Sequence, residues 1–477
     1  MSTSGKPNVL LIIADDLGAD SVIVTDRSPE AKMYVMTDAG GPRDLGELDF
    51  LSVLLRNGLY FEQAWAQPVC SPTRASIYSG TWPWRNGVGY PMTPQLNPAI
   101  VTALPVLLGP EGYQSGLFGK WHLGSNAGFR PPDHGWDMHV GTLGGVVLDY
   151  ENWNKDSSAT GYASATLTTT YATRDTVEEA GTWINGLAAN VPWFATIAFH
   201  SPHDPFHEPP SGYQLPRGAT PTTDDEMFNA MSQNFDANIG RLLGSGVGPA
   251  MDSIPQDQLE NTVIIFIGDN GSPPTVAEEE PKTEIGEGGV RVPMIVADGA
   301  SVAAEMAGAT APPAFLAQEK LNKRTKKLVH VVDLYEAIAE IAGVSPASLP
   351  AVRDSVSLWR FPSLAGNLPP TRQYNFSQFY RATILGATIR NNGYKLNCEV
   401  VPAGPTTWAF YEYFEGEIPG LEGAAGTASD IFASALADVQ AGVSNPAADN
   451  LNELLDELIL SGNYQLDDAG TLWADPR

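Results

Sequence analysis

The chain has 477 residues, enough for one large domain and a smaller one around a substantial hydrophobic core. Its 55 acidic and 27 basic residues give a formal net charge of −28. This charge argues against nucleic acid or an anionic membrane as partner, because both need a basic face. An acidic coat indicates solubility in a salty or extracellular setting, with a cationic partner as the alternative. An anionic substrate would require the few cations to gather in one pocket.

The two cysteines, Cys70 and Cys398, lie far apart and exclude a disulfide framework and a multi-cysteine zinc site. No stretch reaches the ~18 apolar residues of a transmembrane helix, so we expect no membrane span. The polar residues 1–7 lead into an apolar run, residues 9–13, that is too short for a signal peptide. The sequence as written predicts a cytoplasmic protein, or a periplasmic or secreted one if a leader is removed.

Apolar runs that end in polar residues predict a set of buried strands. These runs cover residues 8–14, 193–199, 262–268 and 292–297. Patterns typical of helices lie between and beyond them, over residues 45–57, 173–187, 224–243 and 331–341. The alternation predicts an α/β fold with a mostly parallel central sheet sandwiched by helices.

From about residue 373 the pattern changes to short alternating strands. Residues 382–390, an Asn-Asn-Gly turn and residues 394–397 predict a β-hairpin. We therefore divide the chain into a large domain, residues 1–370, and a smaller C-terminal α+β domain with antiparallel strands, residues 371–477. Residues 350–371 are the expected connection, and residues 218–223 and 416–428 are expected loops.

Oxygen-bearing side chains follow two of the predicted strands. Asp15 and Asp16 follow the first strand, and Asp269 and Asn270 follow the strand of residues 262–268. Open α/β sheets place their sites at the carboxyl ends of strands, and these four side chains gather if the two strands end side by side. Carboxylate and amide oxygens select calcium or magnesium rather than zinc. Either pair alone could equally well cap a helix or form a turn.

The most specific motif is Cys70-Ser-Pro-Thr-Arg-Ala-Ser-Ile-Tyr-Ser-Gly. Alone, Cys70 would be a buried cysteine before a helix. The cysteine, with proline two residues on and Arg74 two further, resembles the signature of the formylglycine-dependent sulfatases, arylsulfatase-like enzymes of the alkaline phosphatase superfamily. The resemblance implies that a formylglycine-generating enzyme oxidises Cys70 to an aldehyde. One hydroxyl of the hydrated aldehyde would attack sulfur and the other would expel sulfate, with Arg74 stabilising the nucleophile.

A second motif, Gly119-Lys-Trp-His-Leu-Gly, is also similar to the family. It implies that Lys120 contacts a sulfate oxygen and that His122 contacts the formylglycine hydroxyl, where a pKa near neutrality suits proton removal. A Lys-x-His pair by itself is more often a surface feature. His203 and Lys282 match two further family positions and are implied to bind sulfate oxygens, and either could be the general acid.

For the metal, the resemblance implies that Asp15, Asp16, Asp269, Asn270 and the modified Cys70 are the ligands. Ca²⁺ is the commoner ion in the family and Mg²⁺ is the alternative. Asp269 would also take a proton from the attacking hydroxyl. The matching motifs run in the family's order from residue 8 to about residue 293, so residues 1–370 are the expected catalytic domain.

Two features depart from the family pattern. Residues 21–44 are longer and less regular than expected, and predict a lid or a substrate wall. Lys282 precedes Thr283-Glu-Ile-Gly, where the family commonly has a glycine and an aromatic residue.

Several other residues have expected roles. His134, His139 and His330 are expected to be structural, His200 and His207 to contact substrate or be structural, and Arg291 to support the loop of Glu287. Six aromatic residues could stack on a sugar or aryl ring, although at least half of them should be packing residues: Trp82, Trp84, Tyr90, Trp136, Trp153 and Trp408.

The predicted activity is hydrolysis of small-molecule or glycan sulfate monoesters to sulfate and an alcohol. One alternative is a phosphonate or phosphodiester hydrolase of the same superfamily. The other is a non-catalytic pseudoenzyme that binds sulfated glycans. Lys120, His122, His203 and Lys282 favour sulfate, which carries less charge than a phosphate monoester, and the competent residue at each matched position argues against a pseudoenzyme. The sequence leaves the particular ester open.

Overall fold

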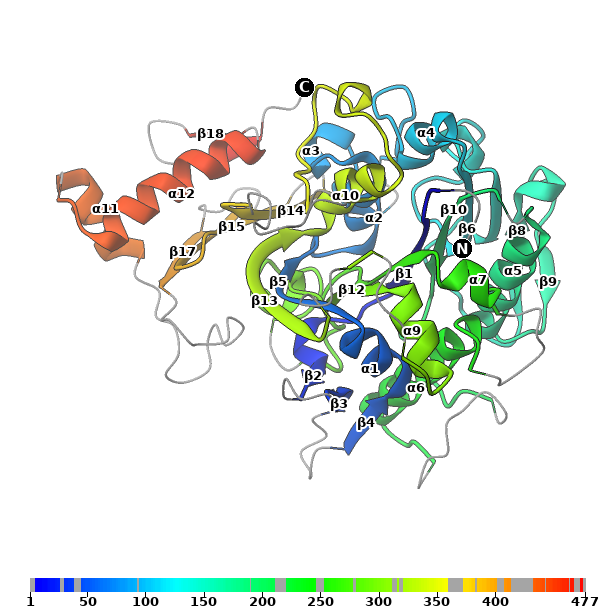
Figure 1. Cartoon of the computed structure of the whole chain (residues 1–477). Coiled ribbons are helices and arrows are strands. Elements are labelled where there is room, and N and C mark those ends of the chain that lie inside the picture. Colours follow the sequence, from blue (N-terminus) through cyan, green and yellow to red (C-terminus); the bar gives the residue numbers. More distant parts are fainter. Residues whose placement is uncertain are drawn as a thin grey trace.

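Figure 1 presents the protein as a computed structural model, in which a large α/β body carries a smaller sheet with two helices at one side. The described residues are 5–25, 30–37, 44–91, 94–188, 190–210, 220–245, 253–277, 280–310, 315–316, 321–358, 372–381, 384–400, 407–412, 432–441, 443–462, 464–466 and 472–474. Within these ranges, no helix is long and apolar enough to cross a bilayer.

A ten-stranded sheet of described residues forms the centre of the large body. In spatial order its strands are β13 (Lys323–His330), β5 (Gly58–Trp65), β12 (Met294–Asp298), β11 (Thr262–Gly268), β1 (Asn8–Ala14), β10 (Trp193–Ala198), β6 (Gln114–Lys120), β7 (Met138–Thr142), β8 (Trp153–Ser157) and β9 (Thr166–Thr168). The strands from β11 to β7 are all parallel, whereas β12 and β8 run antiparallel to their neighbours. The mostly parallel central sheet predicted from the sequence is confirmed.

Helices cover both faces of this sheet. Successive residues of a strand point to opposite faces, and in the central strands the residues on both faces are apolar. On β1, Val9 and Leu11 belong to one core cluster and Leu10 and Ile12 to the other. The first cluster includes α2 (Cys70–Ser79), α4 (Leu104–Leu108) and α10 (Leu334–Ile341), and the second includes α1 (Asp49–Arg56), α5 (Ala172–Gly186), α6 (Asp224–Leu242) and α9 (Gly299–Met306). Each fully buried aliphatic side chain contributes roughly 1.5–3 kcal/mol.

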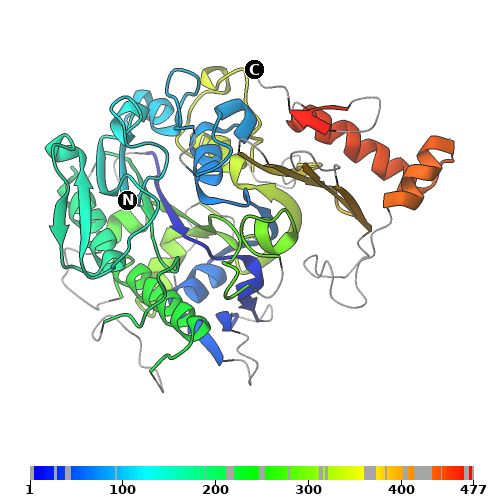
Figure 2. The same ribbon diagram turned by 180° about the vertical axis from the view of Figure 1, so that it is seen from behind.

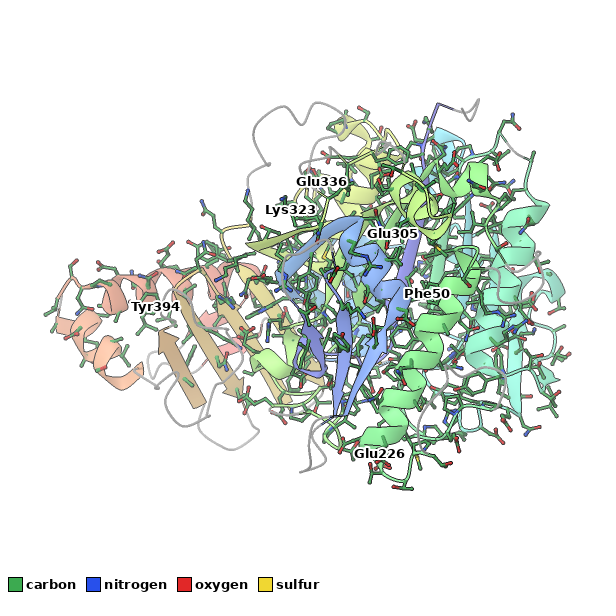
Figure 3. All side chains as sticks on the ribbon, turned by 60° about the horizontal axis from the view of Figure 1, so that its bottom comes forward. Phe50, Glu226, Glu305, Lys323, Glu336 and Tyr394 are labelled. Atoms are coloured by element: carbon green, nitrogen blue, oxygen red, sulfur yellow. The ribbon has the colours of Figure 1, made fainter. Side chains whose placement is uncertain are left out.

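Helix α6 has a capping box at its start, and a residue in its middle, Asp236, caps the start of α1. Thr223 Oγ1 accepts the Glu226 N–H, and the Glu226 carboxylate accepts the Thr223 N–H, a capping box. Asp236 accepts the N–H groups of Phe50 and Leu51 at 3.0 and 2.7 Å and thereby caps α1. Figure 3 labels Glu226 at the end of α6 and Phe50 beside this helix.

The region before α1 differs from the prediction. We expected a helix from residue 45, but Asp44–Leu48 is strand β4, which pairs with β3 (Met33–Thr37) and through it with β2 (Val22–Val24). Pairing with β3 overrides the helical pattern of these residues. In the described part of residues 21–44, Met33 and Val35 are fully buried in the core cluster of α1 and α6. The role of this segment as a lid or substrate wall stays a prediction.

The C-terminal part contains an antiparallel sheet of β14 (Asn375–Arg381), β15 (Ile384–Arg390), β16 (Tyr394–Val400) and β17 (Thr407–Glu412). Helix α12 (Pro446–Gly462) packs on it through Leu451, Leu454 and Leu458, and α11 (Phe432–Ala441) lies beside α12. Figures 1 and 2 show this sheet and its helices projecting from one side of the large body. The predicted hairpin is β15 and β16, and the small C-terminal antiparallel sheet is confirmed.

The remaining α-helices and strands of the described residues are short: α3 (Pro83–Asn86), α7 (Gln256–Leu259), α8 (Glu287–Val290), β18 (Tyr464–Leu466) and β19 (Leu472–Ala474). The predicted connection 350–371 and the predicted loop 218–223 are described only in part, and the predicted loop 416–428 lies outside the described residues. The division at residue 370 stays a prediction.

Candidate active site

The two pairs of oxygen-bearing side chains meet because β1 and β11 are parallel neighbours with Ala14 opposite Gly268. The Asp16 N–H donates to Asp269 Oδ1 at 3.0 Å, and Asn270 Nδ2 donates to Asp16 Oδ1 at 2.8 Å. Asp15, Asp16, Asp269 and Asn270 are all fully buried. The carboxyl edge of the sheet therefore holds three buried carboxyl groups and an amide within one site, as predicted.

Two fully buried cations balance these carboxylates. Lys120, the last residue of β6, donates to Asp15 Oδ2 at 2.6 Å. Arg74, one turn into α2, donates to Asp269 Oδ2 through Nε at 3.1 Å and Nη2 at 2.8 Å, and to the Lys120 carbonyl at 3.0 Å. Burial of a charge costs several kcal/mol, and removing one partner of such a pair costs about 3–5 kcal/mol. The four side chains are therefore one electrostatic unit.

Cys70 is the first residue of α2 and faces His122, with 3.2 Å between Cys70 Sγ and His122 Nδ1. Ser71 Oγ fixes this arrangement by donating to the His122 carbonyl at 2.7 Å. Burial, with a smaller contribution from Asp15, raises the pKa of the Cys70 thiol to about 11. Burial and the charge of Lys120 hold the His122 pKa well below its ordinary value. At neutral pH the pair is therefore a neutral thiol beside a neutral imidazole.

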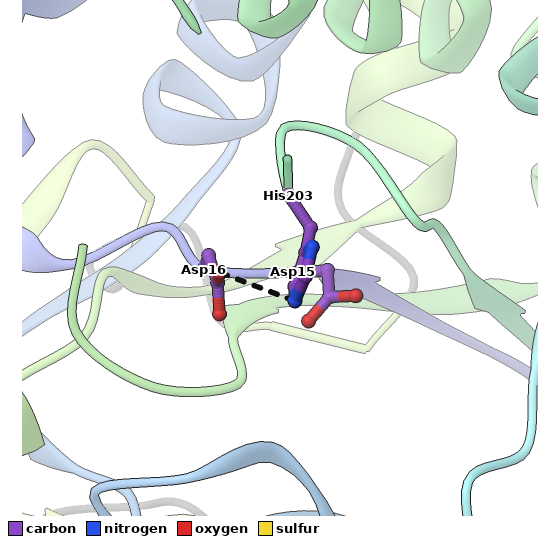
Figure 4. A group of neighbouring side chains, drawn as sticks. All are labelled: Asp15, Asp16 and His203. Atoms are coloured by element: carbon purple, nitrogen blue, oxygen red, sulfur yellow. Dashed lines mark ion pairs between the residues drawn. The ribbon is translucent and has the colours of Figure 1, made fainter. Parts of the chain in front are cut away.

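His203 and Lys282 approach the site around Asp16. Lys282 Nζ donates to Asp16 Oδ2 at 2.5 Å, and His203 Nε2 lies 3.6 Å from the same oxygen, the ion pair drawn in Figure 4. Asp16 and Asp15 raise the His203 pKa to about 9 against the opposing effect of burial. Tyr150 Oη donates to the carbonyls of both His200 and His203 at 2.8 Å. The site thus gathers four cations in a protein of net charge −28.

The donor set fits a hard cation. Asp15 Oδ1 and Asn270 Oδ1 are buried and accept no hydrogen bond within the described part of the chain. Burial raises the Asp15 pKa to about 6, and a divalent cation would compensate for this. Geometry alone groups Asp15, Asp16 and His203. Asp15 and Asp16 also belong to the set of oxygen donors predicted from the sequence, and oxygen donors are the ligands that hard divalent cations prefer.

The structure brings every predicted site residue into this one place. The set is Asp15, Asp16, Cys70, Arg74, Lys120, His122, His203, Asp269, Asn270 and Lys282, and the role of each in catalysis stays a prediction. The motifs did not indicate Tyr150, which holds His200 and His203 through their carbonyls. Gly145 was also missed: a Cβ there would lie 2.3 Å from the His122 ring, so any other residue would displace the histidine from its present position.

The other candidate residues have structural surroundings. His200 Nε2 lies 2.8 Å from Thr142 Oγ1, and His207 Nε2 lies 2.9 Å from Tyr171 Oη. His134, His139 and His330 are buried, as expected. Arg291 Nε lies 3.6 Å from Glu287 Oε2, in line with the predicted supporting role. Of the six aromatic candidates, Trp82, Trp136 and Trp153 are buried packing residues, and Trp84, Tyr90 and Trp408 are half-buried.

Open α/β sheets carry their binding and catalytic sites at the carboxyl ends of the strands, where this group of buried carboxylates and cations lies. Residues 7–344 match the family model described as Sulfatase, and the chain belongs to the sulfatase family. It is therefore a hydrolase of that family.

Two curated relatives and one solved structure illustrate the likeness. A sulfatase from Formosa agariphila is 26% identical over 414 residues, covering 72% of this chain and 69% of that protein. Human N-acetylgalactosamine-6-sulfatase is 26% identical over 388 residues, covering 73% of this chain and 65% of the human protein. The crystal structure of Ps i-CgsB in complex with k-i-k-neocarrahexaose has a TM-score of 0.66 at 21% identity and covers 91% of this chain and 90% of that chain, a likeness of fold.

Proposed function

We propose that the protein hydrolyses sulfate monoesters of aryl or carbohydrate alcohols, with Cys70 converted to formylglycine as the nucleophile. The observation that carries this proposal is the place of Cys70, at the start of α2 and 3.2 Å from His122 Nδ1, within the site of buried carboxylates and cations. Burial raises the pKa of the thiol to about 11, which favours the protonated form at neutral pH, unlike the low-pKa thiolates of cysteine enzymes. Conversion to an aldehyde would supply a hydrated hydroxyl group there, which a protonated thiol cannot replace.

The surrounding residues suit an anionic substrate. Lys120, His203 and Lys282 would bind the sulfate oxygens and stabilise the charge that develops as the ester bond breaks. Arg74 holds Asp269 and lies one helical turn from Cys70. The low pKa of His122 leaves its Nδ1, 3.2 Å from Cys70 Sγ, free to accept a proton from the nucleophile position. Of the two candidate acids, the His203 pKa of about 9 is the better matched to proton donation near neutral pH.

We propose that Asp15, Asp16, Asp269 and Asn270 would hold a hard divalent cation, since all four side chains offer oxygen donors. Ca²⁺ is expected before Mg²⁺ because it is the commoner ion in the family that the motifs resemble. When bound, the ion would act as a Lewis acid that lowers the pKa of a hydroxyl group at the Cys70 position. The two buried oxygens without hydrogen-bond partners, Asp15 Oδ1 and Asn270 Oδ1, support this set.

A carbohydrate sulfate is the substrate class that we propose first. The human relative is named for an N-acetylgalactosamine sulfate, and the Ps i-CgsB structure contains a neocarrahexaose. The half-buried Trp84 and Tyr90 lie on the chain shortly after α2, where a sugar ring could stack.

The test is a substrate panel with the protein produced together with a formylglycine-generating enzyme. Sulfate release would be measured from 4-nitrophenyl sulfate and from N-acetylgalactosamine 6-sulfate, and phosphate-ester cleavage from bis(4-nitrophenyl) phosphate and a phosphonate monoester. We expect calcium-dependent sulfate release that Cys70→Ala abolishes. Efficient phosphodiester or phosphonate cleavage without sulfate release would replace this proposal with the alternative hydrolase of the superfamily. Binding of sulfated sugars without any turnover would favour a pseudoenzyme.

A further inference from the structure

Helix α8 lies in backbone contact with the residue that follows Asn270. The Gly271 N–H donates to the Gly289 carbonyl at 2.9 Å. A Cβ on Gly271 would lie 1.8 Å from the Gly288 carbonyl oxygen, a distance that no side chain tolerates. The backbone of α8 therefore determines where Asn270 can lie.

The same helix contacts the segment that carries Lys282 on its other side. A Cβ on Gly289 would lie 2.1 Å from the Glu284 carbonyl oxygen and 2.8 Å from that of Pro281. The Glu284 N–H donates to the Pro281 carbonyl at 3.1 Å, which closes a turn around Lys282. Because Gly288 and Gly289 have no side chains, the backbone of α8 lies between the segments that carry Asn270 and Lys282 and contacts both.

Only four residues long, α8 needs an external anchor, and its first residue, Glu287, provides it. Glu287 is 2% exposed. Its Oε2 accepts from Trp65 Nε1 at 3.3 Å, and its Oε1 accepts from Arg390 Nη1 at 3.3 Å and lies 3.6 Å from Lys395 Nζ. Arg390 ends β15 and Lys395 lies in β16, so both cations come from the C-terminal sheet.

This buried cluster is charged. Lys395, Arg390 and Arg291 lower the Glu287 pKa although burial raises it, so the carboxylate is ionised. Arg390 also donates to Gln63 Oε1 at 2.9 Å, which ties it to β5 in the central sheet. An ionised carboxylate in the interior cannot move away from its cations without a large desolvation penalty, which makes the anchor a stiff one.

We propose that Glu287, Arg390 and Lys395 form a positioning cluster through which the C-terminal sheet sets the place of Lys282 and Asn270, and with it the affinity for sulfate. This inference rests on the proposed function of the Lys282 site. All three side chains are buried, so each is placed to act through α8 rather than on the substrate.

The experiment compares two arginines that join the C-terminal part to the large body. Arg390→Met removes a cation of the positioning cluster. Arg372→Met is the matched control, because Arg372 pairs with the buried Asp333 at 2.5 Å, and Asp333 otherwise accepts from His330 and Val356 rather than from the Lys282 segment. The dissociation constant of inorganic sulfate and the KM for an aryl sulfate would be measured well below the melting temperature of each variant.

We expect Arg390→Met to weaken sulfate binding and raise KM about tenfold, because small displacements of positioning residues have such effects. Arg372→Met should lower the melting temperature and leave both constants near those of the parent. Arg390→Lys, which keeps the charge, should restore part of the affinity. In a Lys282→Met background, Arg390→Met should raise KM little further, because both changes act on the contact between Lys282 and sulfate.

Equal effects of Arg390→Met and Arg372→Met, or full additivity with Lys282→Met, would overturn the inference while leaving the proposed function intact. If Arg390→Met does not fold, Glu287→Gln takes its place beside the Arg372→Met control. The expected results and the results that overturn the inference are then the same as for Arg390→Met. A parent protein that neither binds sulfate nor cleaves any ester would refute the proposed function, and the inference would fall with it.

Discussion

At the scale of single residues, the site differs from an ordinary cysteine enzyme by the charge around Cys70. Burial, and with smaller contributions Asp15, Asp269 and Asp16, raises the pKa of the thiol, so the site would bind a cation more readily than it would form a thiolate. The two lysines at this site are not equivalent: Lys120 is fully buried, whereas the side chain of Lys282 is 21% exposed. Substitutions at these lysines should therefore have separable effects.

Lys282→Met should raise KM roughly 10- to 100-fold, the equivalent of about 1.5–3 kcal/mol for a hydrogen bond to a charged group. Its effect on stability should be smaller than that of losing a fully buried lysine, because His203 Nε2 remains 3.6 Å from the Asp16 carboxylate. Steady-state kinetics and a melting curve measure the two effects. Lys155→Met, which removes a partly exposed lysine paired with Asp175 and Glu179, is the control and should leave KM unchanged.

Lys120→Met should instead unfold or strongly destabilise the protein, since it removes the hydrogen-bonded cation of the buried Asp15 and leaves, among the described residues, only the ion pair with Arg74 Nη2 at 4.0 Å, a cost of about 3–5 kcal/mol. Differential scanning calorimetry of the variant with and without calcium tests this. A melting temperature equal to that of the parent would show that the Lys120–Asp15 contact contributes little.

Removal of metal should lower the melting temperature as well as the activity. A ligand present at about 1,000 times its dissociation constant stabilises a fold by about 4 kcal/mol, and a chelator removes that contribution. Scans in excess EDTA and in calcium measure the difference. Asp15→Asn is the control, because it weakens the proposed ligand set and should reduce the difference between the two scans.

At the scale of elements, the cap that α6 provides for α1 gives a prediction of pH dependence. Burial raises the Asp236 pKa to about 7, against the ordinary value of 3.8, although the N–H groups of Phe50 and Leu51 lower it. The folded state therefore binds a proton more tightly than the unfolded chain does. The contribution of Asp236 to stability should fall as the pH rises from about 4 to about 7, by about 4 kcal/mol in total.

Melting temperatures of the parent and of Asp236→Asn between pH 4.5 and 8 measure this contribution. The parent should lose stability relative to the variant as the pH rises, because asparagine does not titrate. Asp236→Ala removes the cap and should be less stable than Asp236→Asn, by about 1 kcal/mol or more. A constant difference between the parent and Asp236→Asn across this range would contradict the raised pKa.

The elements show where the sequence is informative and where it is not. The strands that deliver Asp15 and Asp269 were predictable because each is a continuous apolar run with polar residues at its end. Strand β4 was predicted as a helix, because its identity depends on pairing with β3 rather than on its own residues. The roles of Arg390 and Tyr150 were not predictable, since their partners lie 103 and 50 to 53 residues away and no local pattern marks them.

At the scale of the whole molecule, the net charge of −28 produces self-repulsion in the folded state. Salt screens this repulsion, with a Debye length that falls from about 30 Å at 0.01 M to about 8 Å at 0.15 M. The melting temperature should therefore rise between 10 and ~300 mM sodium chloride. The sodium chloride series is measured in magnesium-free, calcium-saturated buffer, which keeps the occupancy of the proposed metal site constant. A falling melting temperature would show that surface ion pairs outweigh the repulsion.

The central claim is that Cys70 becomes formylglycine and acts as the nucleophile of a sulfate ester hydrolase. The most direct test measures the mass of the tryptic peptide that contains Cys70, with and without a formylglycine-generating enzyme, and sulfate release by the same samples. The account predicts a loss of about 18 Da, the change from thiol to aldehyde, in proportion to activity. Activity from a sample in which Cys70 remains a thiol, or a fully converted sample that releases no sulfate from any ester, would contradict it.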